Sequence, residues 1–119
     1  GVILAFDAFI LNEDRHLNNI AFLYRDGEFR IAPIFDNGLS LLSDTKLFGY
    51  DAQLFHNIRK VNSKTFSSDF KKQLRAVETP FEIDGNKLAI ELENNKHILG
   101  RTYDVIHRQM GNYEGTLVF

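Results

Sequence analysis

The sequence predicts an α+β domain that is mainly α-helical and carries one β-hairpin. Residues 2–11 are apolar almost without interruption, which is typical of a buried helix. Two short apolar runs, at 20–24 and 29–35, flank an Asp-Gly pair, and this arrangement is a strong hairpin signal. Beyond residue 44, apolar side chains recur with helical spacing between capping residues and turn residues.

The turn determines how the two strands of the hairpin pair. With Asp26-Gly27 at the turn, Phe22 lies opposite Ile31 and Tyr24 lies opposite Phe29. One face of the hairpin is then apolar along its length. We therefore expect Phe22 and Ile31 to be buried against a core.

The same register, continued past the strands, brings two polar residues near each other. It sets Asn19 opposite Ile34 and Asp36 opposite Leu17. The backbones of Asn19 and Asp36 are then expected at the diagonal separation of a strand pair, about 7–8 Å. Their side chains could share one cation.

The rest of the chain is predicted to be helical support. Residues 51–60 form either a helical turn or a loop. We expect three further helices: 69–77, with Ser67 or Ser68 as its N-cap, 86–94, capped by Asp84, and about 96–110, ended by Gly111. Residues 1–119 therefore form a single domain, in which 44–119 support the helix, polar loop and hairpin of 1–43.

Composition narrows the class of protein. At 119 residues the chain is long enough for one hydrophobic core, and its net charge of −2 gives no overall attraction to nucleic acid or to an anionic membrane. Without cysteine it has neither disulfides nor thiolate metal sites. No run reaches the ~18 apolar residues of a membrane span, and no signal peptide is evident. We expect a cytoplasmic protein with no direct nucleic-acid or membrane partner, and a chain that is part of a longer protein.

The polar loop between the first helix and the hairpin carries residues suited to phosphoryl transfer. Asp14 lies five residues before Asn19, and Asp36 follows the second apolar run. Protein kinases use this Asp-to-Asn interval for a general base and a metal ligand, and a later Asp before a Gly as the second metal ligand. The base must keep a free carboxylate near the attacking hydroxyl, while Mg²⁺ takes only one or two carboxylates from the protein.

The pattern Asn12-x-Asp14-Arg15-His16-x-x-Asn19, with the apolar helix before it and Ala32-Pro33-Ile34-Phe35-Asp36 after it, resembles a known family. It looks like the C-terminal lobe of the HipA-like serine/threonine kinases, closely over about residues 1–43 and more loosely beyond. The Asp-Arg-His-x-x-Asn core also resembles the catalytic loop of the phosphoinositide kinases, a more distant branch. One departure is Asn37-Gly38 after Asp36, where protein kinases have Phe-Gly.

The resemblance implies a protein-kinase-like C-terminal lobe in which the hairpin carries the catalytic and metal-binding loops. It implies Asp14 as catalytic base and Asn19 and Asp36 as ligands of Mg²⁺ and, through it, of ATP. The phosphoryl group would pass to a serine or threonine hydroxyl of a protein substrate, with an antitoxin or a separate N-lobe as further partner. His16 is either a second base, as in the phosphoinositide kinases, or a structural histidine anchoring the loop, which we favour. Arg15 pairs with Asp36 or Asp7, or is solvated.

Two alternatives weigh against this interpretation. Asn12 and Asp14 could simply cap a helix, and Asp36-Asn37-Gly38 could be an ordinary turn, but their joint order and spacing favour the kinase. The chain contains no Gly-rich loop and no identifiable strand lysine to clamp ATP. We therefore expect the isolated chain to be inactive. The rival hypothesis is a degenerate, non-catalytic kinase lobe that acts as a protein-interaction module.

Overall fold

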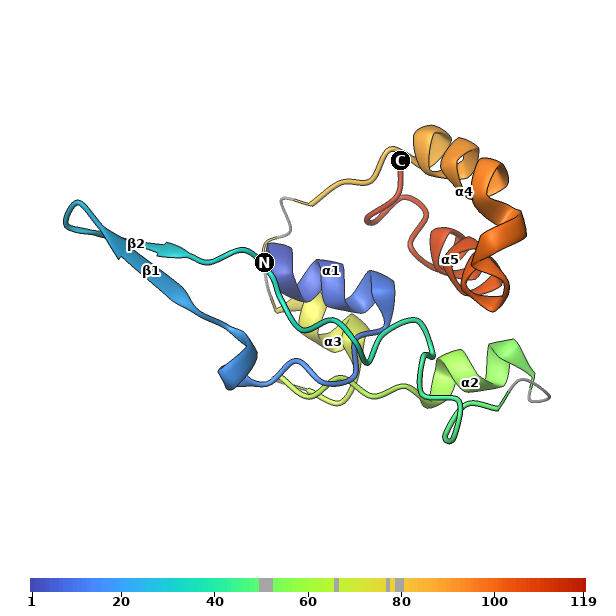
Figure 1. Ribbon diagram of the computed structural model, residues 1–119, viewed down its shortest axis with the longest axis horizontal. Coiled ribbons are helices and arrows are strands. Elements are labelled where there is room, and N and C mark those ends of the chain that lie inside the picture. Colours follow the sequence, from blue (N-terminus) through green and yellow to red (C-terminus); the bar gives the residue numbers. More distant parts are fainter. Residues whose placement is uncertain (50–52, 66, 77, 79–80) are drawn as a thin grey trace.

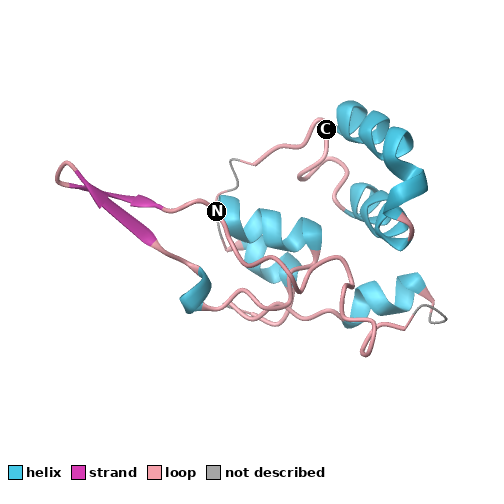
Figure 2. Ribbon diagram, in the orientation of Figure 1, coloured by secondary structure: helices cyan, strands magenta, loops and turns pink. Residues whose placement is uncertain are grey.

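The computed structural model describes residues 1–49, 53–65, 67–76, 78 and 81–119. Its elements in chain order are α1 (Val2–Ile10), the 3-10 helix η1 (Leu17–Asn19), β1 (Phe22–Arg25), β2 (Glu28–Ile31), α2 (Leu54–Lys60), α3 (Phe70–Arg75), α4 (Gly85–Leu99) and α5 (Arg101–Asn112). The helices gather in one body and the hairpin projects from it (Figures 1 and 2). The prediction of a mainly helical α+β domain with one antiparallel hairpin is confirmed for the described residues.

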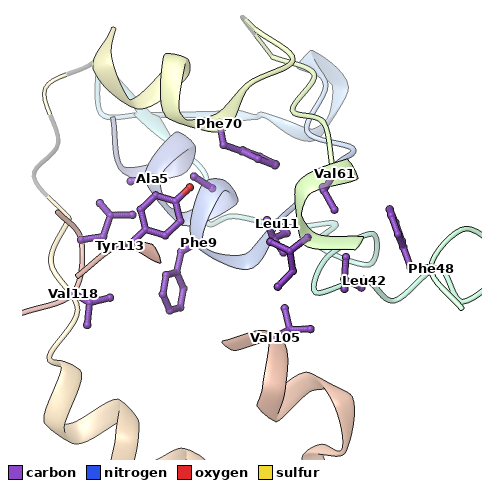
Figure 3. Close-up of a cluster of buried hydrophobic side chains, with 13 residues drawn as sticks. Ala5, Phe9, Leu11, Leu42, Phe48, Val61, Phe70, Val105, Tyr113 and Val118 are labelled. Carbon is purple, nitrogen blue, oxygen red and sulfur yellow. The ribbon is translucent and has the colours of Figure 1, made fainter. Parts of the chain in front are cut away.

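Helix α1 is the centre of the hydrophobic core. Ala5 and Ala8 are fully buried, and their small side chains let α3 and α5 approach the helix. Phe70 of α3 lies on one side of α1 and Val105 of α5 on the other (Figure 3). The continuous apolar run at 2–11 therefore forms the buried helix that its composition predicts. Among the described residues, no helix is both long and apolar enough to cross a membrane.

The C-terminal end of α1 is held by a side chain from α5. The amide nitrogen of Gln109 donates to the carbonyl oxygens of Ala8 at 3.0 Å and Phe9 at 2.9 Å, and Gln109 is only 1% exposed. The last carbonyls of a helix lack partners within the helix, so these bonds satisfy groups that burial would otherwise leave unpaired. Leu11 then ends the helix in the left-handed conformation, with φ of 55°. The direction of the following polar loop is thereby fixed.

The hairpin has the predicted register but not the predicted burial. Phe22 pairs with Ile31 and Tyr24 with Phe29, as the Asp-Gly turn requires. Yet Phe22 is 62% exposed and Ile31 is 58% exposed, so the expectation of a buried face is wrong. The hairpin points away from the helices, and the radius of gyration of 15.2 Å exceeds the roughly 13.5 Å of a compact chain of this length. Alternating apolar residues specify a face but not what covers it.

The structure decides one open alternative downstream and corrects the predicted N-cap of α3. Residues 54–60 are helical, which settles the choice between turn and loop. Helix α3 is capped by Asp69, whose side chain accepts from two backbone N–H groups, while Ser67 bonds the backbone nitrogen of Asp69 instead. An aspartate can fill the N-cap position as well as a serine can. Val77, the expected end of this helix, lies outside the described residues.

Helices α4 and α5 divide at a different residue from the one expected. Asp84 caps α4 by accepting from the Lys87 nitrogen, as predicted. The helix then runs to Leu99, and the break falls at Gly100, whose φ of 52° suits a residue without Cβ. Gly111 does not end α5, which continues to Asn112. The expected gap at residue 95 does not occur, and α4 runs through Asn94 and Asn95 although asparagine is a weak helix former.

Phe9 of α1 and Phe22 of β1 provide a matched test of this arrangement. Phe9→Ala should cost about 3–5 kcal/mol of unfolding free energy, because it empties a buried position in the core. Phe22→Ala should cost less than about 1 kcal/mol, since it removes only a cross-strand contact on an exposed face. Urea denaturation of both variants measures the difference. Equal losses would mean that the hairpin is covered in solution.

Candidate functional site

The loop after α1 is shaped by the amide of Asn12, which is 1% exposed. Its nitrogen donates to Asp7 Oδ1 at 3.0 Å, and its oxygen accepts from the backbone N–H of Asp14 at 3.1 Å. This second bond closes a turn in which the side chain of residue i bonds the backbone of residue i+2. The side chain of Asn12 thus shapes the loop that presents Asp14 rather than capping a helix.

Arg15 forms a buried, two-point ion pair with Asp7 of α1. Its Nε donates to Asp7 Oδ2 and its Nη2 to Asp7 Oδ1, both at 2.9 Å. The side chains are 1% and 4% exposed. Of the three alternatives considered for Arg15, the structure therefore shows the pairing with Asp7. Parallel bonds of this kind fix the plane of the guanidinium as well as its distance.

The same guanidinium joins the two segments that carry the predicted metal ligands. Nη1 donates to the carbonyl oxygens of Asn19 at 3.3 Å and Phe35 at 2.8 Å, and Nη2 donates to Asn37 Oδ1 at 2.5 Å. Arg15 thus holds the residues on both sides of Asp36 next to the Asn19 backbone. The predicted extension of the strand register to these residues is wrong, because the ladder stops soon after Ile31, with one further bond from Ala32 N to Ala21 O at 2.8 Å.

Asn19 and Asp36 offer two oxygen ligands of different kinds. Asn19 is buried, and its amide nitrogen donates to the Asp14 carbonyl oxygen at 3.2 Å, so its amide oxygen is the atom available to a cation. Asp36 is exposed, has a left-handed backbone with φ of 56°, and makes no side-chain hydrogen bond or ion pair within the described residues. One amide and one free carboxylate fit Mg²⁺, which fills its other positions with water and phosphate oxygens.

No larger set of metal ligands competes with this pair. In the part of the chain that the structure describes, no three His, Cys, Asp or Glu side chains gather in a way that could hold a metal ion. A cavity of about 660 Å³ lies between α2, α3 and α5. Asp14, Asn19 and Asp36 do not line it, so the candidate site is an open cluster of loops and not a closed pocket.

Asp14 has a partner that the sequence did not suggest. Lys64 Nζ lies 2.8 Å from Asp14 Oδ1, across 50 residues of sequence. The pKa of Asp14 is lowered mainly by this hydrogen bond, which keeps the carboxylate ionised. Lys64 lies in the polar stretch at 62–68, whose composition predicts only a linker. No spacing rule connects it to Asp14, because the contact depends on how the loop after α2 folds back.

His16 is close to Asp14 but does not anchor the loop. Its side chain is 45% exposed, and its Nε2 lies 3.9 Å from Asp14 Oδ2, beyond hydrogen-bond distance. The favoured structural role is therefore not supported, and His16 stays a candidate second base. Glu13 lies on the other side of Asp14. Burial, followed by the charge of Asp44, raises the pKa of Glu13.

The contribution of the Asp7–Arg15 ion pair to stability can be tested by substitution. Arg15→Ala should lower the unfolding free energy by about 3–5 kcal/mol, because it leaves Asp7 buried without a counter-charge. Arg25→Ala is the matched control: its guanidinium is 89% exposed and faces Asp26 at 3.8 Å, so the change should stay within about 0.5 kcal/mol. Thermal and urea unfolding followed by circular dichroism measure both. A stable Arg15→Ala protein would contradict the central role of the pair.

Comparison with known proteins found no family model, no curated protein and no solved structure that matches this chain. The residues of the loop and their geometry are therefore what indicates the function.

Proposed function

We propose that this chain is the catalytic-loop and metal-binding part of a HipA-like serine/threonine kinase. The observation that carries the proposal is the guanidinium of Arg15, which bonds the Asn19 backbone and both neighbours of Asp36. These bonds bring the backbone of the proposed ligand Asn19 and the segment that carries the proposed ligand Asp36 to one buried side chain, which follows the proposed base Asp14 in the sequence. This is the arrangement that phosphoryl transfer needs, since its catalysis depends mainly on positioning and charge stabilisation.

In the proposed reaction Asp14 accepts the proton of a serine or threonine hydroxyl on a protein substrate. The hydroxyl oxygen forms a bond to the γ-phosphorus of ATP as the bond from that phosphorus to the ADP oxygen breaks. An ionised Asp14 suits this task, because only the carboxylate can accept the hydroxyl hydrogen. Asn19 and Asp36 would hold Mg²⁺, which neutralises charge on the transferred phosphate.

A second candidate function is favoured by the exposed hairpin. Phe22, Tyr24, Phe29 and Ile31 are between 58% and 75% exposed and alternate along the two strands. Exposed apolar residues gathered on one element are typical of interaction surfaces. A degenerate lobe would use this surface to bind an N-lobe or an antitoxin without catalysing transfer. Only the kinase function requires the carboxylates of Asp14 and Asp36.

Substitution of the two aspartates tests the kinase proposal in the intact gene product. Asp14→Asn should reduce phosphate transfer from γ-labelled ATP by about 10²–10⁴-fold and leave Mg²⁺–ATP affinity nearly unchanged, because a base acts mainly in the transition state. Asp36→Asn should instead weaken Mg²⁺-dependent ATP binding. Asp26→Asn in the exposed turn is the control and should change neither. If the unmodified protein transfers no phosphate, the interaction module is the better hypothesis.

The 119-residue chain alone should bind Mg²⁺–ATP weakly. Asn19 and Asp36 supply only two ligand oxygens, and the sequence contains no Gly-rich loop to enclose the phosphates. Isothermal titration calorimetry should give a dissociation constant on the order of 1 mM or weaker. Micromolar binding by this chain would show that other residues of the chain clamp the nucleotide.

A further inference from the structure

The loop between α2 and α3 brings a lysine to the candidate base. Lys64 Nζ lies 2.8 Å from Asp14 Oδ1, while its side chain remains 58% exposed. An ammonium group has three donors, so the bond to Asp14 uses only one of them. The charged or titratable residues beside Asp14 in the loop are Glu13, which Asp44 also influences, His16 and Arg15, whose charge is paired with Asp7. Lys64 is thus the cation that contacts the Asp14 carboxylate directly.

This contact is fixed by bonds on both sides of Lys64. The Thr65 hydroxyl donates to the Arg15 carbonyl oxygen at 3.0 Å, which ties the loop to the catalytic segment itself. Ser63 is buried, and its backbone N–H donates to the Ser68 carbonyl oxygen at 3.0 Å. Val61 is part of the hydrophobic core. Because the residues around Lys64 are held by these contacts, the loop fixes the position of the Lys64 backbone next to Asp14.

We infer that Lys64 is a positioning residue for phosphoryl transfer: it holds Oδ1 of Asp14 so that Oδ2 faces the acceptor hydroxyl, and it keeps a positive charge beside the transferred phosphoryl group. The inference rests on the proposed kinase function and assigns Lys64 a role within it. The proton of the hydroxyl moves to Asp14 Oδ2, and Lys64 neither gains nor loses a proton. His16 does not hold the Asp14 carboxylate in the same way, since its Nε2 lies 3.9 Å from Asp14 Oδ2, beyond hydrogen-bond distance.

A lysine at this place supplies what the acidic residues around it cannot. The transferred phosphoryl group carries negative charge over its three outer oxygens, and Glu13, Asp14 and Asp44 would repel it. An ammonium acts on phosphate as a point charge, so its exact rotamer is less critical than its presence. Arginine at the same position should therefore retain part of the effect, whereas an uncharged side chain of similar length should not.

The test compares Lys64→Met, Lys64→Arg and the control Lys71→Met, an exposed lysine on α3, in the intact gene product. Phosphate incorporation from γ-labelled ATP into the protein itself and into casein is followed as a function of ATP concentration. Lys64→Met should lower kcat by about tenfold or more and leave KM for ATP within about twofold, because misplacing the base affects mainly the transition state. Lys64→Arg should retain part of the lost kcat, and Lys71→Met should match the unmodified protein. Melting temperatures should be equal throughout, since Lys64 is exposed.

The outcomes separate this inference from the function on which it rests. If the unmodified protein transfers phosphate and Lys64→Met is as active as Lys71→Met, the role of Lys64 is refuted and the kinase stands. A parallel loss of melting temperature and kcat in both Lys64 variants would make the lysine structural and also refute the inference. If the unmodified protein transfers no phosphate, the kinase proposal and this inference fail together.

Discussion

The buried ion pair between Asp7 and Arg15 is the constraint on which the rest of the structure depends. An unpaired charge in the interior costs several kcal/mol, so both groups must find partners wherever the chain places them. Asp7 satisfies only part of the guanidinium, whose remaining donors need further acceptors. The Asn19, Phe35 and Asn37 segments supply them. The positions of the polar loop after α1 and of the base of the hairpin therefore follow from providing one cation with partners.

This constraint also explains why the local backbone is unusual where the candidate ligands lie. Asp36 has φ of 56°, a conformation that most residues avoid and that Asp and Asn tolerate best. Both of its neighbours are bound to Arg15, so the chain between them has little freedom to relax. The result is a carboxylate directed into solvent with no partner in the described residues. Strain held in place by surrounding bonds is a feature common at functional sites.

The sequence predicted what short-range chemistry determines and missed what depends on distant parts of the chain. The Asp26-Gly27 turn sets the strand register by itself, and Asp84 caps its helix through a bond three residues away, so both predictions were confirmed. Burial of the hairpin depends on what packs over it, and the Lys64 contact spans 50 residues. No short sequence pattern indicates either the exposure of the hairpin or the Lys64 contact. The sequence likewise left Asp7, Asp36 and solvent as alternatives for Arg15, and the pairing with Asp7 is seen only in the structure.

The ion pair is better understood as a positioning device than as a source of stability. Helix α1 already contributes fully buried residues to the core, and a buried pair replaced by apolar residues of similar volume is often no less stable. An apolar pair at positions 7 and 15 would fill the same space yet bind none of the carbonyl and amide oxygens that Arg15 now holds. The core could then persist while the loop and the hairpin base lost their common anchor. Retaining a charge inside α1 makes physical sense if the geometry of Asp14, Asn19 and Asp36 is what the chain has to keep.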